Sequence, residues 1–326
     1  MRPGGTCAIV AVHRAAVAAL LALVFGCGEA SPQSGAERAD EAVRPAVPTH
    51  GLDSLLLDRA YVRAAELPRL YSLLVARHGE LLGERYFQGR TAERRANIKS
   101  ASKSIISALV GIAIAEGELA GLDQKVASSF AADLPENPDP RLQQITIEDL
   151  LSMRAGLEPT SFGNYGDWVS SRNWVRYVLR QPFVDDPGGR MLYSTGNTHL
   201  LSALLTRVTG KSTLAYARDK LTRPLGIELA AWTRDPQGIY FGGNELALRP
   251  RELLSFGELY RNGGRYQGKQ IVPESWIRES WVRRTTSPSM ATAMASAGGS
   301  ASAVATRCTS PGGMAASTCS SCRSWS

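Results

Sequence analysis

An apolar run extends from Ile105 to Ala115 and is hydrophobic at nearly every position. A helix over this run is apolar on all sides, which is typical of a helix inside a protein core rather than on its surface. Gly117 follows the run, and glycine often ends a helix. The pattern therefore predicts a buried helix in the core of the fold.

Alternating and helical patterns define the remaining elements. Tyr71–Arg77 and Glu80–Tyr86 are predicted to be two strands of a hairpin that turns at His78 and Gly79. One hairpin followed by many helices indicates an α+β fold, in which an antiparallel sheet is flanked by helices and carries an all-helical insertion. These helices are predicted at Leu150–Met153 behind the capping-box residues Thr146–Asp149, through the aromatic-rich segment with Trp168, Trp174 and Tyr177, at Leu200–Val208, and at Pro250–Tyr260.

Residues 1–26 have the pattern of a secretory signal, because Arg2 and Arg14 come before a short apolar run. The four residues that end at Cys27 resemble the lipobox of bacterial lipoproteins. We therefore expect an exported protein, held at the periplasmic face of a membrane or at the outer membrane by an acylated Cys27. A secretory signal that is cleaved nearby is the alternative. Residues 27–51 are rich in Ser, Pro, Ala and mixed charge, which predicts a disordered tether.

The composition limits the classes of function. With 326 residues, of which 44% are hydrophobic, the chain can bury a large core in one or two domains. The net charge of +7 does not indicate a nucleic-acid-binding face, because six arginines in residues 1–26 and 283–326, which contain no acid, account for nearly all of it. We therefore expect a folded body over residues 52–282 that binds no nucleic acid.

Ser100 and Lys103 lie where the predicted buried helix begins. Residues three apart in a helix share a face, and free N–H groups surround a side chain at the helix start. A serine hydroxyl is a weak nucleophile until a base takes its proton, and a desolvated lysine with a lowered pKa can be that base. The alternative is a polar helix cap beside a solvated lysine. Against it, Lys103 is the only one of the six lysines that has a serine three residues before it.

Tyr193 is the second candidate for chemistry. It follows the glycine-containing segment Pro187–Arg190 and precedes an apolar helix. Its phenol can move protons between Ser100, water and a leaving group, provided that Lys103 lowers the pKa of the phenol. The alternative is a core tyrosine whose hydroxyl is satisfied by a neighbour.

These motifs together give the chain a family resemblance. Ser100–Lys103, followed by Tyr193–Thr195, resembles the serine hydrolases related to class C beta-lactamases and DD-peptidases, in particular the branch that contains 6-aminohexanoate-dimer hydrolase and certain esterases. The resemblance covers residues 52–281 and is supported by the segments Ile147–Gly156, Tyr193–Thr198, Leu246–Leu253 and Ile271–Trp276.

The resemblance implies a serine hydrolase that cleaves an ester or amide bond of a small molecule through an acyl-enzyme on Ser100, without a cofactor. Lys103 is then the activator of the serine, and Tyr193 the general acid and base. Family members often have asparagine two residues after the tyrosine, where this chain has Thr195. The residues expected to bind substrate are Thr195, Asn197 and Tyr165.

Two other functions remain open. The resemblance also permits a DD-peptidase or beta-lactamase activity. Such enzymes have a third motif, lysine or histidine with glycines, on a C-terminal strand that supplies an oxyanion-hole N–H, and the chain never shows this motif. Its C-terminal strands are thus expected to be missing, so the chain is also interpretable as an inactive family member that acts at most as a binding lipoprotein.

The cysteines and histidines indicate no further chemistry. Cys319 and Cys322 have a metal or redox spacing, but one pair without companion ligands is a weak signal, and we expect no metal site. Since Cys7 falls in the signal and Cys27 is the proposed anchor, no disulfide is expected in the body. His199 is expected to be structural, because lysine already fills the role of base.

We predict that residues 283–326 are the product of a frameshift. They are rich in Ser, Ala, Thr, Gly and Cys without periodicity. In another frame, the codons of Ala291–Ala295 can spell Tyr-Gly-Tyr-Gly and those of Gly312–Ser317 can spell Gly-Tyr-Gly-Gly-Gln, which are phrases expected in the last strands of the family. Sequencing of the coding DNA should show that this frame has no stop codon through the region, and interrupting stops would disprove the hypothesis.

Overall fold

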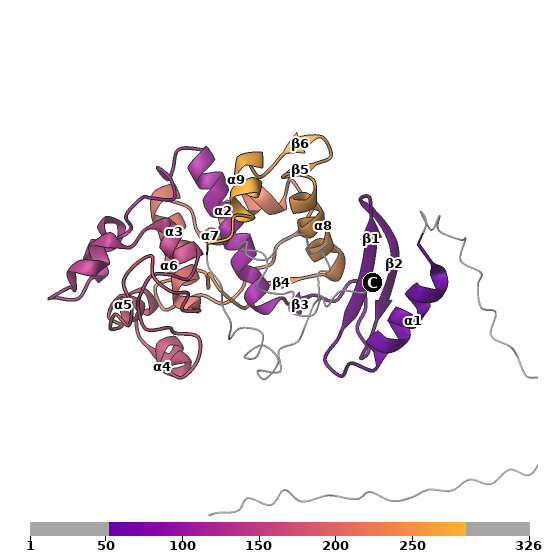
Figure 1. The fold of residues 1–326 in the computed structure, drawn as a ribbon, viewed down its shortest axis with the longest axis horizontal. Coiled ribbons are helices and arrows are strands. Elements are labelled where there is room, and N and C mark those ends of the chain that lie inside the picture. Colours follow the sequence, from indigo (N-terminus) through magenta and orange to yellow (C-terminus); the bar gives the residue numbers. More distant parts are fainter. Residues whose placement is uncertain (1–51, 285–326) are drawn as a thin grey trace, which may run out of the picture. The chain divides into compact units, whose positions relative to one another are not determined.

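A computed structural model describes residues 52–284 of the chain (Figure 1). The predicted signal, tether and most of the tail lie outside these residues. The strands are β1 (Ser72–Arg77), β2 (Glu80–Tyr86), β3 (Ala96–Asn97), β4 (Ala247–Leu248), β5 (Arg265–Tyr266) and β6 (Lys269–Gln270). The α-helices are α1 (Ser54–Ala65), α2 (Ser102–Ala115), α3 (Ile147–Leu151), α4 (Tyr165–Ser170), α5 (Trp174–Leu179), α6 (Thr195–Thr209), α7 (Thr213–Ala217), α8 (Pro250–Arg261) and α9 (Glu274–Ser280). Short 3₁₀ helices form η1 (Lys99–Ala101), η2 (Ala127–Asp133) and η3 (Pro140–Gln144), and η4 (Arg218–Thr222) is a π-helical turn.

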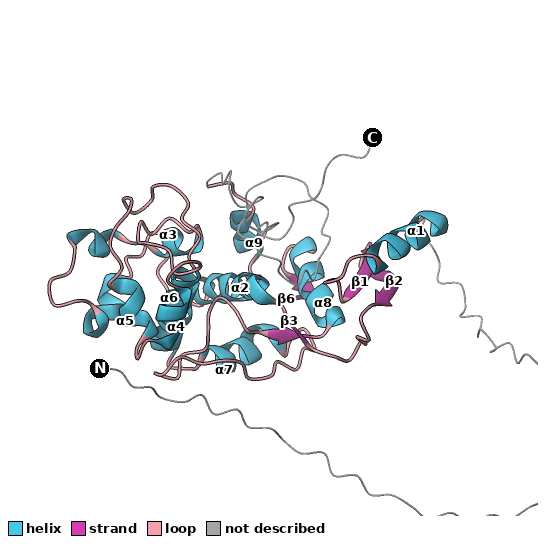
Figure 2. Ribbon diagram, turned by 90° about the horizontal axis from the view of Figure 1, so that it is seen from below, coloured by secondary structure: helices cyan, strands magenta, loops and turns pink. Residues whose placement is uncertain are grey.

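The structure confirms the predicted α+β class. Within residues 52–284, helices predominate and the strands are short (Figure 2). The strands pair as three antiparallel ladders, β1 with β2, β3 with β4, and β5 with β6. The predicted antiparallel sheet is thus present in the described part of the chain as separate two-stranded pieces.

α2 is the buried helix that the sequence predicts. Ala108, Leu109 and Val110 have no exposed surface, and the helix packs against α6 (Figure 1). A Cβ atom added at Gly111 would lie 2.2 Å from the ring of Trp276, so the absence of a side chain lets α9 pack directly on α2. The apolar run therefore forms the centre of the core because neighbours cover every side of it.

The predicted hairpin is present as β1 and β2. Its turn is formed by His78 and Gly79, whose φ angles of 54° and 85° lie in the left-handed region. A register shift between Val75 and Ala76 interrupts the ladder. Glycine adopts such a φ angle without steric cost, and this explains why the turn falls where the sequence places it.

The short β3–β4 ladder sets the position of η1. Ala96 and Asn97 pair with Leu248 and Ala247, and the N–H of Ile98 donates to the carbonyl of Leu246 at 2.9 Å. This pairing joins two segments that are far apart in the sequence. The chain consequently enters η1, and then α2, from a fixed direction.

Two helices begin earlier than the sequence indicates. α3 begins at Ile147 because Thr146 and Asp149 form the predicted capping box, with reciprocal hydrogen bonds of 3.1 and 2.9 Å to the backbone. α6 begins at Thr195 rather than Leu200, so its buried polar first turn is helical as well. Gly210, with a φ angle of 64°, ends α6.

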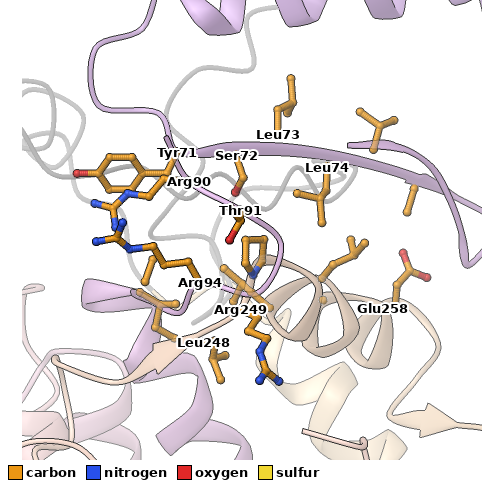
Figure 3. Close-up of a pocket in the computed structure, with 18 residues that line it drawn as sticks. Tyr71, Ser72, Leu73, Leu74, Arg90, Thr91, Arg94, Leu248, Arg249 and Glu258 are labelled. Atoms are coloured by element: carbon orange, nitrogen blue, oxygen red, sulfur yellow. The ribbon is translucent and has the colours of Figure 1, made fainter. Parts of the chain in front are cut away.

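A cavity of about 120 Å³ lies between β1, the β3–β4 ladder and α8 (Figure 3). Leu74 points from β1 toward α8, and Arg90 and Arg94 lie at one side of the cavity. The lining does not include Ser100, Lys103 or Tyr193. The cavity is therefore separate from the residues expected to carry out chemistry. Within residues 52–284, no helix has the length and apolar character needed to cross a membrane.

Candidate active site

The structure brings Ser100, Lys103 and Tyr193 together. The hydroxyl of Tyr193 donates a hydrogen bond of 2.7 Å to Oγ of Ser100, and Nζ of Lys103 lies 3.3 Å from the same Oγ. The amine also lies 5.1 Å from the centre of the Tyr193 ring. Ser100 belongs to η1 and Lys103 to the first turn of α2, while Tyr193 lies just before α6. Three side chains from two distant parts of the sequence thus meet at one serine oxygen.

The amine of Lys103 is buried, with 7% of the residue exposed. Burial disfavours the charged form and lowers the pKa of Lys103 to about 7. Nζ donates a hydrogen bond of 2.7 Å to the carbonyl of Gly243, and within residues 52–284 no acidic side chain contributes to the pKa shift of Lys103. A large fraction of the amine is therefore neutral near pH 7, and a neutral amine can accept the proton of Ser100.

The condition that Lys103 lowers the pKa of the Tyr193 phenol is not met. Burial raises the pKa of the Tyr193 phenol, and the hydrogen bond with Ser100 opposes this only in part. The physical reason is that burial removes water from the phenol as well as from the Lys103 amine, and loss of water disfavours the charged form of each group. The phenol of Tyr193 is therefore protonated in the site, where it donates a hydrogen bond to Ser100.

Thr195 lies at the edge of the site, but its hydroxyl already has a partner. Its Oγ1 lies 2.8 Å from Oγ of Ser161, and its backbone N–H donates to the same Oγ at 2.7 Å. Thr160 makes a similar contact one residue away, since its Oγ1 accepts from the N–H of Gly196 at 3.0 Å. Thr160 and Ser161 thus hold the segment that follows Tyr193. Neither residue was predicted from the sequence, because nothing in the local pattern marks them.

The two other residues expected to bind substrate differ in position. Asn197 is buried inside α6, and among the described residues its side chain forms no hydrogen bond with Ser100, Lys103 or Tyr193. Tyr165 hydrogen-bonds with the side chain of Asn244, and burial raises the pKa of its phenol. Asn244 follows the residue whose carbonyl accepts from Lys103. Tyr165 is therefore linked to the site through Asn244, whereas Asn197 is buried in the first turn of α6.

The Gly242–Gly243 pair is a further part of the site that sequence reasoning missed. A Cβ atom on Gly242 would lie 2.0 Å from the carbonyl oxygen of Thr198, and one on Gly243 would lie 2.5 Å from the methyl group of Thr195. Only glycines allow the backbone to come this close to α6. The close approach places the carbonyl of Gly243 against Nζ of Lys103. The two consecutive glycines in the sequence are the signal that could have revealed this part of the site.

His199 lies outside the Ser100 cluster, as expected of a structural residue. Its Nε2 lies 3.1 Å from Oδ2 of Asp235, and both side chains are fully buried. Within residues 52–284, no group of three or more His, Cys, Asp or Glu side chains could hold a metal ion. Cys27 and the four other cysteines lie outside the described residues.

The chain belongs to the beta-lactamase family, whose model matches residues 68–303. One relative is the 6-aminohexanoate-dimer hydrolase of Paenarthrobacter ureafaciens, which is 26% identical over 77% of this chain and 67% of its own length. The family relationship confirms the resemblance drawn from the sequence, and with it the class of hydrolases to which the chain is related.

Solved structures show the same fold. A Bacillus anthracis protein, provisionally named a 6-aminohexanoate-dimer hydrolase, superposes with a TM-score of 0.58 at 22% identity, over 71% of this chain and 62% of that one. EstCE1, a hydrolase with promiscuous acyltransferase activity, gives a TM-score of 0.55 at 18% identity, over 73% of this chain and 78% of that one. This chain thus spans less than two thirds of the length of the Bacillus anthracis protein.

The state of Lys103 predicts a pH dependence. We expect the rate at which a fluorophosphonate probe labels Ser100 to rise with pH through a midpoint of about 7, because only the neutral amine can take the serine proton. Lys103→Met should lower the rate by roughly 10²- to 10⁴-fold. The control Lys99→Met removes an exposed amine nearby and should leave the profile unchanged. A labelling rate that does not vary with pH would contradict this role of Lys103.

Proposed function

We propose that the protein is a serine hydrolase that cleaves an ester or amide bond through an acyl-enzyme on Ser100. The observation that carries the proposal is the pair of contacts at Oγ of Ser100, 2.7 Å from the hydroxyl of Tyr193 and 3.3 Å from Nζ of Lys103. One neighbour is a base with a lowered pKa and the other is a protonated donor, which are the two proton carriers that acyl transfer needs.

Acylation follows from these positions. The neutral amine of Lys103 takes the proton of Ser100 as Oγ bonds to the carbonyl carbon of the substrate, and the carbonyl electron pair moves to its oxygen. Free N–H groups at the start of a helical segment can stabilise that oxygen. When the tetrahedral intermediate collapses, the bond to the leaving alcohol or amine breaks. Tyr193 donates its proton to the leaving group and regains one from the ammonium of Lys103.

Deacylation reverses the proton path. Water enters and attacks the acyl carbon, and its proton passes through Tyr193 to Lys103. Collapse of the second intermediate releases the carboxylic acid, and Oγ of Ser100 takes back a proton. Serine, lysine and tyrosine thus return to their starting states, and the net reaction consumes one water molecule per bond cleaved.

The proposed substrate is a small molecule with an amide or ester group. The relative from Paenarthrobacter ureafaciens is named for hydrolysis of an amide dimer, and EstCE1 is named as a hydrolase with acyltransferase activity. We propose Tyr165 and Asn244 as substrate contacts, because they hydrogen-bond with each other and Asn244 follows Gly243, whose carbonyl accepts from Lys103. DD-peptidase activity, which the same family permits, would appear in the same acyl-enzyme assay with a D-alanyl substrate.

The proposed reaction predicts that Ser100→Ala abolishes both hydrolysis of a chromogenic short-chain ester and labelling by a fluorophosphonate probe. The matched control is Ser104→Ala, which removes a hydroxyl one turn further along α2 and should leave both unchanged. A Ser100→Ala variant that retains full turnover would remove Ser100 from the reaction. Absence of labelling in the unaltered chain would instead favour a non-catalytic binding protein.

We also propose that the protein is exported and anchored to a membrane through Cys27, on the basis of the signal and lipobox patterns in the sequence. The chain should incorporate radiolabelled palmitate in a bacterial host, and Cys27→Ser should abolish incorporation. Secretion of unlabelled protein would show an ordinary secretory signal instead. Cys7→Ser is the control, since Cys7 lies before the lipobox.

A further inference from the structure

Asp235 organises a tight turn between residues 233 and 241. Its Oδ1 accepts hydrogen bonds from the N–H groups of Gln237 at 2.9 Å and Ile239 at 2.8 Å. Its own N–H donates to the carbonyl of Ile239 at 2.8 Å, and the N–H of Phe241 donates to the carbonyl of Thr233 at 2.9 Å. One oxygen of the carboxylate thus fixes the shape of the turn, which leaves the other oxygen for a different partner.

That second oxygen joins the turn to α6. Oδ2 of Asp235 lies 3.1 Å from Nε2 of His199, with both side chains completely buried. Nδ1 of His199 is buried and has no hydrogen-bond partner in the described part of the chain. Since a carboxylate accepts, we assign the imidazole proton to Nε2, which leaves Nδ1 as a bare acceptor.

The imidazole of His199 lies in a cage of aromatic rings. The ring centres of Trp174, Trp168 and Phe241 lie 5.3, 5.9 and 6.0 Å from it. A proton on Nδ1 would point into this apolar cage without a partner. The cage therefore favours the tautomer that donates to Asp235.

The turn leads directly to the carbonyl that holds the amine of Lys103. Phe241 is followed by the two glycines that lie against α6, and the position of Gly242 is in contact with Thr198 and His199. The carbonyl of Gly243 then accepts from Nζ of Lys103 at 2.7 Å. His199, which bonds with Asp235, and Thr198, which contacts Gly242, are thus adjacent residues of α6.

We propose that His199 and Asp235 are positioning residues, which hold the carbonyl of Gly243 against the amine of Lys103 without touching the reacting atoms. The proposal deepens the proposed function and rests on it. If the turn moves away from α6, the amine loses its acceptor and water reaches it. The amine is then less desolvated, and it is neutral only at a higher pH.

The surroundings of both groups support this route. The polar groups that face Lys103 are the hydroxyl of Ser100, the phenol of Tyr193 and the carbonyl of Gly243, and no ion pair reaches it within residues 52–284. The charged group that faces His199 is Asp235. Displacement of the turn therefore acts on Lys103 by letting water reach its amine. It does not remove a charged partner of Lys103.

The test compares Asp235→Asn with Asp133→Asn in the full chain. Asparagine has one acceptor oxygen, so it cannot accept both from the N–H groups of the turn and from Nε2–H of His199, and the first variant loses one of these two contacts. The control removes another buried carboxylate, which contacts Arg207 and Asn173. We expect Asp235→Asn to lower fluorophosphonate labelling at pH 7 by roughly tenfold to a hundredfold, as a small displacement of a catalytic group does. The loss should be smaller at high pH.

The decisive measurement is the titration of Lys103 itself. Trace acetylation of the folded protein across a pH series, with Lys103 read by mass spectrometry, reports when the amine becomes neutral and does not require activity. We expect the pH midpoint of the Lys103 titration to rise in Asp235→Asn and to be unchanged in Asp133→Asn. His199→Gln, which retains an N–H donor, should restore most of the native midpoint, whereas His199→Leu should behave like Asp235→Asn.

The outcomes separate the two proposals. An unchanged Lys103 midpoint in Asp235→Asn would overturn the positioning role, and so would an equal shift in both aspartate variants, since that would show general destabilisation. If Asp235→Asn does not fold, the midpoint in His199→Leu decides in the same way. Failure of the native chain to label at Ser100, with a Lys103 midpoint that still shifts as expected, would overturn the proposed hydrolase and leave the positioning role in place.

Discussion

The burial of the Lys103 amine is the interaction on which the site depends. Desolvation lowers the pKa of this amine and raises the pKa of the Tyr193 phenol, so the same environment favours the uncharged form of both groups. Ser100 then lies between a neutral acceptor and a neutral donor. Because neither neighbour needs a counter-ion, the protein can bury this chemistry without a compensating charge.

Three separate contacts hold this arrangement in place. The β3–β4 ladder sets the direction in which the chain enters η1 and α2. Thr160 and Ser161 hold the segment around Thr195, and the Gly242–Gly243 pair brings a backbone carbonyl to Lys103. Each contact joins residues that are far apart in the sequence. The geometry at Ser100 is therefore a property of the assembled core around α2 rather than of any one segment.

Family membership and fold constrain the function without naming the substrate. The relatives superpose at low identity, which shows that the arrangement of elements persists while most side chains differ. One fold can hold many specificities, since the groups that select a substrate lie on segments that vary. In this chain Tyr165 hydrogen-bonds with Asn244, the residue after the one whose carbonyl accepts from Lys103. The cavity between β1 and α8 is not lined by Ser100, Lys103 or Tyr193.

Local patterns in the sequence determined the buried helix, the first hairpin, the capping box of α3 and the spacing of Ser100 and Lys103. These features follow from periodicity and from neighbours a few residues apart, which a sequence displays directly. The tertiary structure alone decided that the pKa of Tyr193 is raised, that Thr195 pairs with Ser161, and that Asn197 is buried in α6. It also decided that the carbonyl of Gly243 lies against Lys103 and that Asp235 pairs with His199. The reason is physical: desolvation and hydrogen bonding depend on which distant segments pack together, and no local pattern records that packing.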